Sequence, residues 1–109
     1  MYNVVDFIGK VITIRTNNGQ ELICKLLGTD EDKKYLTVDR PKVVYVNQED
    51  VVLLPFLLTS PSQELILSTR EIFTIAESLD ITAKDYNEMI VQEKKMELQE
   101  PEPELLDDK

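Results

Sequence analysis

The side chains that could do chemistry are few in this sequence. It contains no histidine and a single cysteine, Cys24. Histidine is the commonest general base and metal ligand, so its absence removes the usual triad base and, with one cysteine, an ordinary structural zinc site. The three glycines lie nine or ten residues apart and form no Walker or dinucleotide-binding loop. We therefore expect a binding or assembly protein rather than an enzyme, with no cofactor and no metal.

The acidic run Asp30-Glu31-Asp32 superficially resembles a cation-binding loop. A twelve-residue calcium loop needs acidic side chains at alternate positions, a central glycine and a terminal glutamate. These are missing, so a solvated turn is the better interpretation. Cys24 lies in a strand-like stretch, where a free cysteine is typically a small buried hydrophobe. A lone cysteine also fits a reducing cytoplasm, our expected localisation.

The acidity of the chain is uneven. The 109 residues carry a formal charge of −9, of which residues 1–79 contribute −3 and residues 80–109 contribute −6. An acidic surface argues against unspecific nucleic-acid binding, because phosphate binding depends on Lys and Arg. It leaves room for a local basic site. No apolar run is long enough to span a bilayer and no signal peptide is evident, so we expect no membrane partner.

Short alternating apolar segments predict the elements that position these side chains. We expect a helical lead-in over residues 3–9 and strands at 11–16, 21–27, 35–38, 43–46, 51–58, 65–67 and 72–75. Asn18-Gly19 predicts a type I′ hairpin turn between the first two strands. Pro41 predicts a bend or an edge position. The segments at 51–58 and 65–67 are either two strands or one long fourth strand broken at Ser60-Pro61.

A helix follows the strands. Thr82 and Asp85 resemble a capping box, and Ala83, Tyr86, Met89 and Ile90 share one helical face. We expect one domain over residues 1–92 and an acidic, disordered tail over 93–109, although residues 93–97 could continue the helix. So many short strands with hairpin spacing imply a small barrel or a strongly bent sheet, with the helix over one open end.

Residues 9–30 resemble the first sequence motif of Sm and LSm proteins. That motif consists of two alternating strands around a turn, with Gly19, Glu21, Gly28 and Asp30 at its fixed positions. Residues 65–75 resemble the second motif more weakly. The whole chain is also similar to small Sm-like proteins of T4-like cyanophages. If the chain is phage-encoded, as this resemblance implies, the expected cytoplasm is that of a bacterial host. The resemblance implies a mainly β fold: a strongly bent, five-stranded antiparallel barrel with, here, a C-terminal α-helix.

The resemblance also implies partners. Sm-like protomers join edge to edge into rings, commonly of six or seven, that bind single-stranded nucleic acid at the pore. We expect a homo-oligomeric ring of five to seven subunits, because a neighbouring copy would satisfy both exposed sheet edges. RNA or single-stranded DNA is the expected ligand, in a role in nucleic-acid processing.

The chain departs from the family at the residues that read bases. Lys33 and Lys34 stand roughly where the family has a stacking side chain and an asparagine, and Ser68 and Thr69 replace a basic residue and a glycine. The candidate nucleic-acid-binding residues are Lys33, Lys34, Tyr35, Thr69 and Arg70. Three cations in two loops would form a belt suited to phosphates rather than bases.

Each of these residues has a plainer interpretation. The lysine pair could be a solvated loop that counters Asp30-Glu31-Asp32, and Tyr35 could be a half-buried strand aromatic instead of a base-stacking ring. A second function therefore stays open: a homo-oligomeric assembly or adaptor protein that keeps the ring and has lost nucleic-acid binding. The acidic charge and the missing basic–glycine pair favour it, with the helix and tail as partner contacts.

Overall fold

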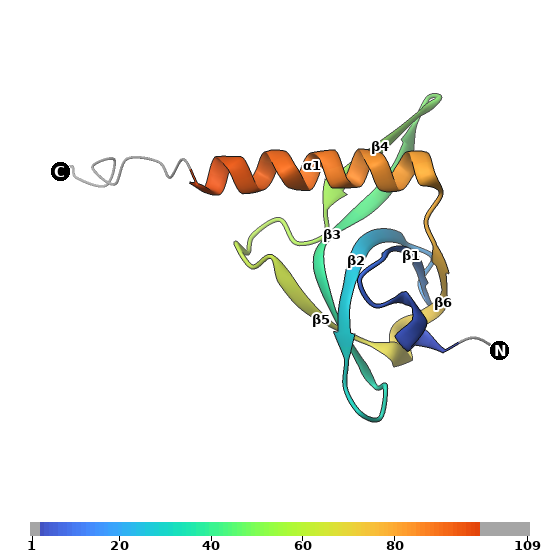
Figure 1. Cartoon of the computed structure of the whole chain (residues 1–109). Helices are drawn as coiled ribbons and strands as arrows, with labels where there is room; N and C mark the ends of the chain where they lie inside the picture. Colours follow the sequence, from blue (N-terminus) through green and yellow to red (C-terminus); the bar gives the residue numbers. More distant parts are fainter. Residues whose placement is uncertain (1–2, 99–109) are drawn as a thin grey trace.

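Six antiparallel strands form one strongly bent sheet in the computed structural model, which describes residues 3–98 (Figure 1). A short 3-10 helix precedes the sheet, another joins its last two strands, and an α-helix follows. In chain order the elements are η1 (Val4–Phe7), β1 (Val11–Thr16), β2 (Glu21–Thr29), β3 (Tyr35–Asn47), β4 (Asp50–Pro55), β5 (Glu64–Ser68), η2 (Thr69–Glu71), β6 (Ile72–Glu77) and α1 (Asp80–Leu98). The predicted class, mainly β with a C-terminal helix, is confirmed.

The outermost lane of the sheet is made of two strands. The sheet order is β4-β3-β2-β1-β6, and β5 also pairs with β3. β4 pairs with residues 42–47 of β3 and β5 with residues 35–39. β4 and β5 therefore lie end to end along one edge of β3, so six strands occupy five positions. Within residues 3–98 no ladder joins β6 to β4 or β5, and the barrel is open.

β3 continues through Pro41 and changes its outer partner there. Proline has no N–H to give to a ladder, and Arg40 adopts a left-handed φ of +47°. The interrupted outer lane is held at this point by two backbone hydrogen bonds, from Arg40 N to Gln63 O (2.7 Å) and from Phe56 N to Pro41 O (3.1 Å). Pro41 predicted either a bend or an edge position. The structure has the bend, because β3 lies between β2 and the β4–β5 lane.

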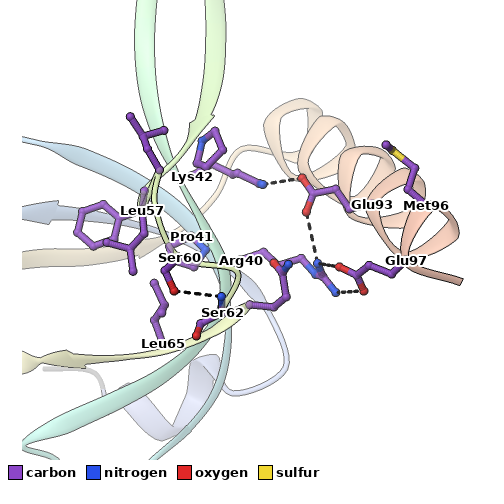
Figure 2. A pocket seen from close by; sticks show the side chains of 14 residues that line it. Arg40, Pro41, Lys42, Leu57, Ser60, Ser62, Leu65, Glu93, Met96 and Glu97 are labelled. Atoms are coloured by element: carbon purple, nitrogen blue, oxygen red, sulfur yellow. Dashed lines mark hydrogen bonds and ion pairs between the residues drawn. The ribbon is translucent and has the colours of Figure 1, made fainter. Parts of the chain in front are cut away.

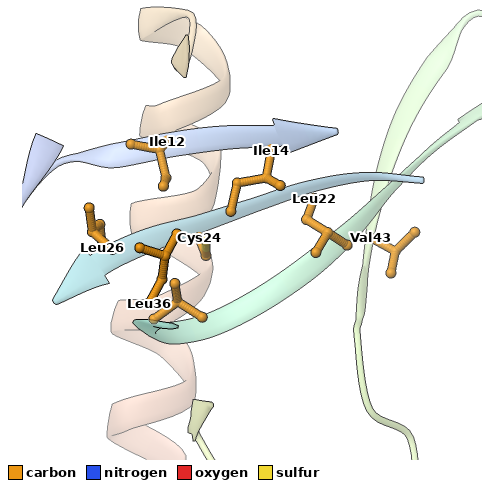
Figure 3. Close-up of a cluster of buried hydrophobic side chains, with 8 residues drawn as sticks. Ile12, Ile14, Leu22, Cys24, Leu26, Leu36 and Val43 are labelled. Atoms are coloured by element: carbon orange, nitrogen blue, oxygen red, sulfur yellow. The ribbon is translucent and has the colours of Figure 1, made fainter. Parts of the chain in front are cut away.

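The main core lies inside the bend of the sheet (Figure 3). Alternation along β1 and β2 sends every second side chain inward, as period-2 patterning requires. The buried members are Ile12, Ile14, Leu22, Cys24, Leu26, Leu36, Val38 and Val43. Cys24 is fully buried, which confirms its predicted role as a small hydrophobe. Burial raises the pKa of its thiol to about 12, aided by the charge of Asp39, so it stays protonated.

The opposite face of β2 carries α1. Ile23 points away from the main core and forms a second cluster with Tyr86 and Ile90, two members of the predicted helical stripe. The Tyr86 hydroxyl donates a hydrogen bond to the Asp39 carbonyl (2.5 Å). The helix begins at Asp80, with a first bond from Ala83 N to Leu79 O, so the predicted cap at Thr82 is wrong. Burial of the stripe on the sheet fixes the position of the helix, and this outweighs a local capping preference.

Two further predictions are corrected by long-range contacts. Residues 93–98, which the sequence assigned to the tail with a continued helix over 93–97 as the alternative, belong to α1, so the alternative is confirmed; Glu93 and Glu97 pair there with cations of β3. Residues 99–109 lie outside the described part of the chain. The first hairpin turn is also different: Gly19 N bonds Thr16 O (3.0 Å), and Asn18 is not among the residues with positive φ. Among residues 16–20 only Gly19 is left-handed, at +91°, so the turn is of the three-residue kind and not type I′.

Candidate nucleic-acid interface

The β3–β5 ladder brings the two predicted cationic segments together. Its last register pair is Tyr35 with Ser68, so the residues before β3 meet the residues after β5. Thr69 N donates to Lys34 O (2.9 Å), and the Thr69 hydroxyl lies 3.1 Å from Lys33 O and 3.0 Å from Lys34 O. We call this unit the loop corner: residues 30–35 together with η2. It contains all five predicted site residues.

Asp30 orders the first half of the loop corner. Its Oδ1 accepts hydrogen bonds from Lys34 N (2.7 Å) and Tyr35 N (2.9 Å), and its carbonyl accepts one from Lys33 N (3.0 Å). The hydrogen bond from Tyr35 is the largest cause that holds the pKa of this carboxyl below its ordinary value. Asp30 is thus committed to the backbone of the loop, which supports the turn interpretation of the acidic run over a cation site.

The cations of the loop corner are exposed and unpaired. Lys33, Lys34 and Arg70 are all solvent-exposed. In the described part of the chain, the ion pairs within 4.0 Å involve none of the three. Tyr35 is 52% exposed, so about half of this residue is accessible to solvent. Thr69 differs from the other four because its hydroxyl hydrogen points at loop carbonyls and its role in the fold is to join the two segments.

A third segment, which the sequence did not reveal, also contacts the loop corner. Asn17, in the β1–β2 turn, donates its side-chain Nδ2–H to Arg70 O (2.7 Å) and its backbone N–H to Glu71 O (2.9 Å). Asn17 and Arg70, which the side-chain bond joins, lie 53 residues apart in the chain. No local pattern marks Asn17, because hairpin turns are rich in asparagine for reasons of their own.

Two other cations, Arg40 and Lys42, are buried and paired with the acidic helix (Figure 2). The Arg40 guanidinium meets both carboxylate oxygens of Glu97 (2.8 and 3.2 Å), and Lys42 Nζ lies 2.6 Å from Glu93 Oε2. Arg40 Nη1 also lies 3.4 Å from Glu93 Oε1. The hydrogen bond from Arg40 is the main cause that lowers the pKa of Glu97. We call these four residues the helix clamp.

A cleft of about 380 Å³ lies beside the helix clamp (Figure 2). The loop between β4 and β5 supplies its apolar wall through Phe56, Leu57 and Leu58, and Met96 of α1 lies at its rim. The cations of the clamp line this cleft but are already matched by carboxylates. This arrangement attaches α1 to the sheet and offers little free charge to a ligand.

Both open edges of the sheet carry exposed apolar side chains. On the β4–β5 lane these include Val51 and Ile66, and on β6 the most exposed is Phe73. The register of β1 with β6 shifts between Arg15 and Thr16, so β6 contains a bulge that takes in Phe73. Bulges re-aim side chains, and this one leaves Phe73 74% exposed at the edge.

Residues 3–98 contain neither a metal-like group of three or more His, Cys, Asp or Glu side chains nor a helix long and apolar enough to cross a membrane.

Comparison with known proteins gives only structural neighbours. No family model and no curated protein matches the sequence. Among solved structures, the chain is similar to a heptameric archaeal Sm protein, with 13% identity and a TM-score of 0.49 over 70% of this chain and 96% of that one. The SmAP1 heptamer of P. aerophilum is 13% identical, with a TM-score of 0.49 over 70% of this chain and 88% of that one. A chain of the NatC complex bound to CoA is 14% identical, with a TM-score of 0.49 over 77% of this chain and 95% of that one. Likenesses at this level assign no family, so the function has to come from the residues of this chain.

Proposed function

We propose that this protein forms a homo-oligomeric ring of the Sm type and binds single-stranded nucleic acid, through its phosphates, at the loop corner. One observation carries the proposal: three exposed, unpaired cations stand on two segments that the backbone N–H and the hydroxyl of Thr69 hold together, beside a half-exposed tyrosine. Each copy would contribute Lys33, Lys34 and Arg70 to a basic belt. The protein would act as a binding scaffold in nucleic-acid processing and not as an enzyme.

Phosphates are the expected contact because the corner offers few groups for reading bases. The side-chain oxygen Oδ1 of Asp30 and the hydroxyl hydrogen of Thr69 are already directed at loop backbone. The remaining exposed side-chain groups are two ammonium groups, a guanidinium, a phenol and the carboxylates of Glu31, Asp32 and Glu71. Lysine and arginine bind phosphates without sequence preference, and a tyrosine ring stacks on any base. We therefore expect similar affinity for RNA and DNA single strands of different sequence.

The ring follows from the two open edges. β6 and the β4–β5 lane each present one unpaired side of a strand, which is a template for pairing with another chain. Pairing β6 of one copy with the lane of the next satisfies both edges when the rotation closes. It would also cover Phe73 and Ile66, which are costly to leave in water.

The binding test uses fluorescently labelled single strands of RNA and DNA, titrated at several salt concentrations. Wild type should bind with a salt dependence of about −0.7 per phosphate contact, hence about −2 for three contacts of one protomer. Changing Lys33, Lys34 and Arg70 together to Glu should abolish binding. Persistent binding in that variant would place the site elsewhere.

A matched control reverses three exposed lysines outside the corner, Lys25 of β2 and Lys84 and Lys95 of α1, to Glu. Both triple variants have the same net charge, so general repulsion of nucleic acid is equal in the two. The control variant should keep most of the wild-type affinity. Equal loss in both would show that the corner has no special role.

The ring test is native mass by light scattering. Wild type should give five to seven copies, and Phe73→Ser should lower the mass. Ile81→Ser, a change at an equally exposed apolar residue (71%) of α1, should not. A monomeric wild type would contradict the ring. A ring that fails to bind single strands would instead support an assembly or adaptor role, which the charge of −9 and the acidic helix favour.

A further inference from the structure

The β1–β2 turn uses its two asparagines differently. Asn18 bonds within the hairpin: its Oδ1 accepts from the Thr16 hydroxyl and lies 3.4 Å from Gln20 N. Asn17 bonds outside it, to the carbonyls of Arg70 (2.7 Å) and Glu71 (2.9 Å). The turn therefore links β1 and β2 to η2 through one residue.

The two carbonyls that Asn17 binds come from the end of a very short helix. η2 has three residues, and such a helix leaves most of its backbone groups without internal partners. Thr69 is held from one side by the carbonyls of Lys33 and Lys34. Asn17 holds Arg70 and Glu71 from the other side. η2 is thus fixed between two hairpin loops, with Arg70 at its centre.

We propose that Asn17 is a positioning residue of the loop corner: it holds the backbone at Arg70, so that this guanidinium is kept beside the lysine pair before a phosphate arrives. The inference rests on the proposed function and adds a residue to it. Ordering a segment at the moment of binding costs conformational entropy, and a segment that is already fixed avoids most of that cost. Loss of the Asn17 hydrogen bonds should therefore weaken binding although Asn17 touches no phosphate itself.

The test measures single-strand binding of Asn17→Ala, which removes the Nδ2 donor, and of Asn17→Asp, which replaces that donor with a negatively charged oxygen. Asn17→Ala should weaken binding about fivefold, the effect of losing one ordinary hydrogen bond. Asn17→Asp should weaken it further, because its negative charge also repels phosphate. Asn18→Ala is the control, since the side chain of Asn18 bonds only within its own turn, and it should bind like wild type. In an Arg70→Ala background, Asn17→Ala should cause no further loss, because Asn17 acts through Arg70. The proposal is overturned if Asn17→Ala weakens binding as much in the Arg70→Ala background as in wild type. It is also overturned if Asn17→Ala weakens binding in neither background.

Tryptic cleavage after Arg70 gives a readout that does not need a nucleic acid. The bond that trypsin cuts joins the two residues that Asn17 binds. Cleavage there should become several-fold faster in Asn17→Ala, relative to cleavage after Lys95 in the same sample, and stay unchanged in Asn18→Ala. If wild type binds no single strand, the proposed function fails, and the proteolysis still decides whether Asn17 holds η2. Unchanged cleavage in Asn17→Ala overturns the positioning role.

Discussion

The loop corner and the helix clamp are built from the same residue types and use them in opposite ways. Each contains one arginine and at least one lysine near an end or the bend of β3. In the clamp, Arg40 and Lys42 are 7% and 5% exposed and meet Glu93 and Glu97 directly. In the corner, the cations are exposed, and hydrogen bonds from other side chains and from the backbone to backbone groups hold the segments together. The cations of the clamp stabilise the fold through ion pairs, whereas the cations of the corner remain available to a ligand.

The difference follows from burial. A buried cation is very unfavourable without a partner, so Arg40 and Lys42 draw carboxylates from the acidic helix. An exposed ion pair contributes little, so nothing forces Lys33 and Lys34 to pair with the neighbouring Glu31 and Asp32. The position of a cation in the fold, rather than the number of cations in a segment, decides whether it can meet a phosphate.

The largest expected effect is on the clamp. Glu93→Ala leaves Lys42 buried without its closest carboxylate. Removing one partner of a fully buried pair costs about 3–5 kcal/mol, and because Glu93 keeps 30% exposure we expect about 2 kcal/mol in urea unfolding. Glu88→Ala, at an exposed position of the same helix, should change stability by less than about 0.5 kcal/mol. Equal effects would mean that the clamp adds nothing.

A smaller loss separates the two ways in which α1 is attached. Tyr86→Phe keeps the buried ring and removes the hydroxyl that donates to the Asp39 carbonyl. Burial raises the pKa of this phenol, so it remains a donor at all ordinary pH values. The expected cost is about 1 kcal/mol of unfolding free energy. Tyr45→Phe, at a half-exposed tyrosine, is the control and should be neutral. A loss as large as that of Glu93→Ala would make the tyrosine, not the clamp, the main attachment.

A single lysine of the corner should affect binding and leave stability alone. Lys34→Ala should weaken single-strand binding a few-fold and reduce the salt slope by about 0.7, the value for one phosphate. Its unfolding free energy should change by less than about 0.5 kcal/mol, since the corner is held through backbone atoms. The same variant losing stability with unchanged affinity would reverse the contrast between the two regions.

The smallest effects concern pH. The pKa values of Asp30 and Glu97 lie below their ordinary values of 3.8 and 4.5, so each stabilises the fold above those values. That stability is lost as pH falls through the lowered pKa values. In Asp30→Asn and in Glu97→Gln, the unfolding free energy should fall less steeply at acid pH than in wild type. The measurement is the unfolding free energy as a function of pH.

Salt distinguishes the two carboxylates. The shift of Glu97 depends on a charged guanidinium and should shrink in high salt, whereas that of Asp30 depends mainly on backbone N–H groups and should persist. Identical salt behaviour in the two variants would contradict these causes.

Much of the fold could be predicted from local patterns. Alternation placed the strands and Cys24 in the core, and helical spacing placed Tyr86 and Ile90 on the buried face of α1. The broken outer lane was foreseen at Ser60-Pro61, and the two alternatives prove compatible, because β4 and β5 are separate strands in one lane. The type I′ turn at Asn18-Gly19 and the helix cap at Thr82 were wrong. Both features depend on contacts with residues that are remote in the chain.

The candidate site divides in the same way. The resemblance to Sm motifs selected Lys33, Lys34, Tyr35, Thr69 and Arg70, and the structure places all five in one corner. Their binding of nucleic acid stays a prediction. Asn17 could not be found, because its partners are remote in the chain and asparagine is common in turns.

The sequence by itself determined the period of each segment, the buried faces and the supply of charge, because these depend on neighbouring residues and on side-chain chemistry. Only the tertiary structure decided which charges are paired. Glu93 and Glu97 look like part of an acidic tail in the sequence, and they become the partners of Lys42 and Arg40 because the bend of β3 and the burial of Tyr86 bring them within hydrogen-bonding distance. Electrostatic pairing depends on distance in space and on burial, and neither quantity is local in the chain.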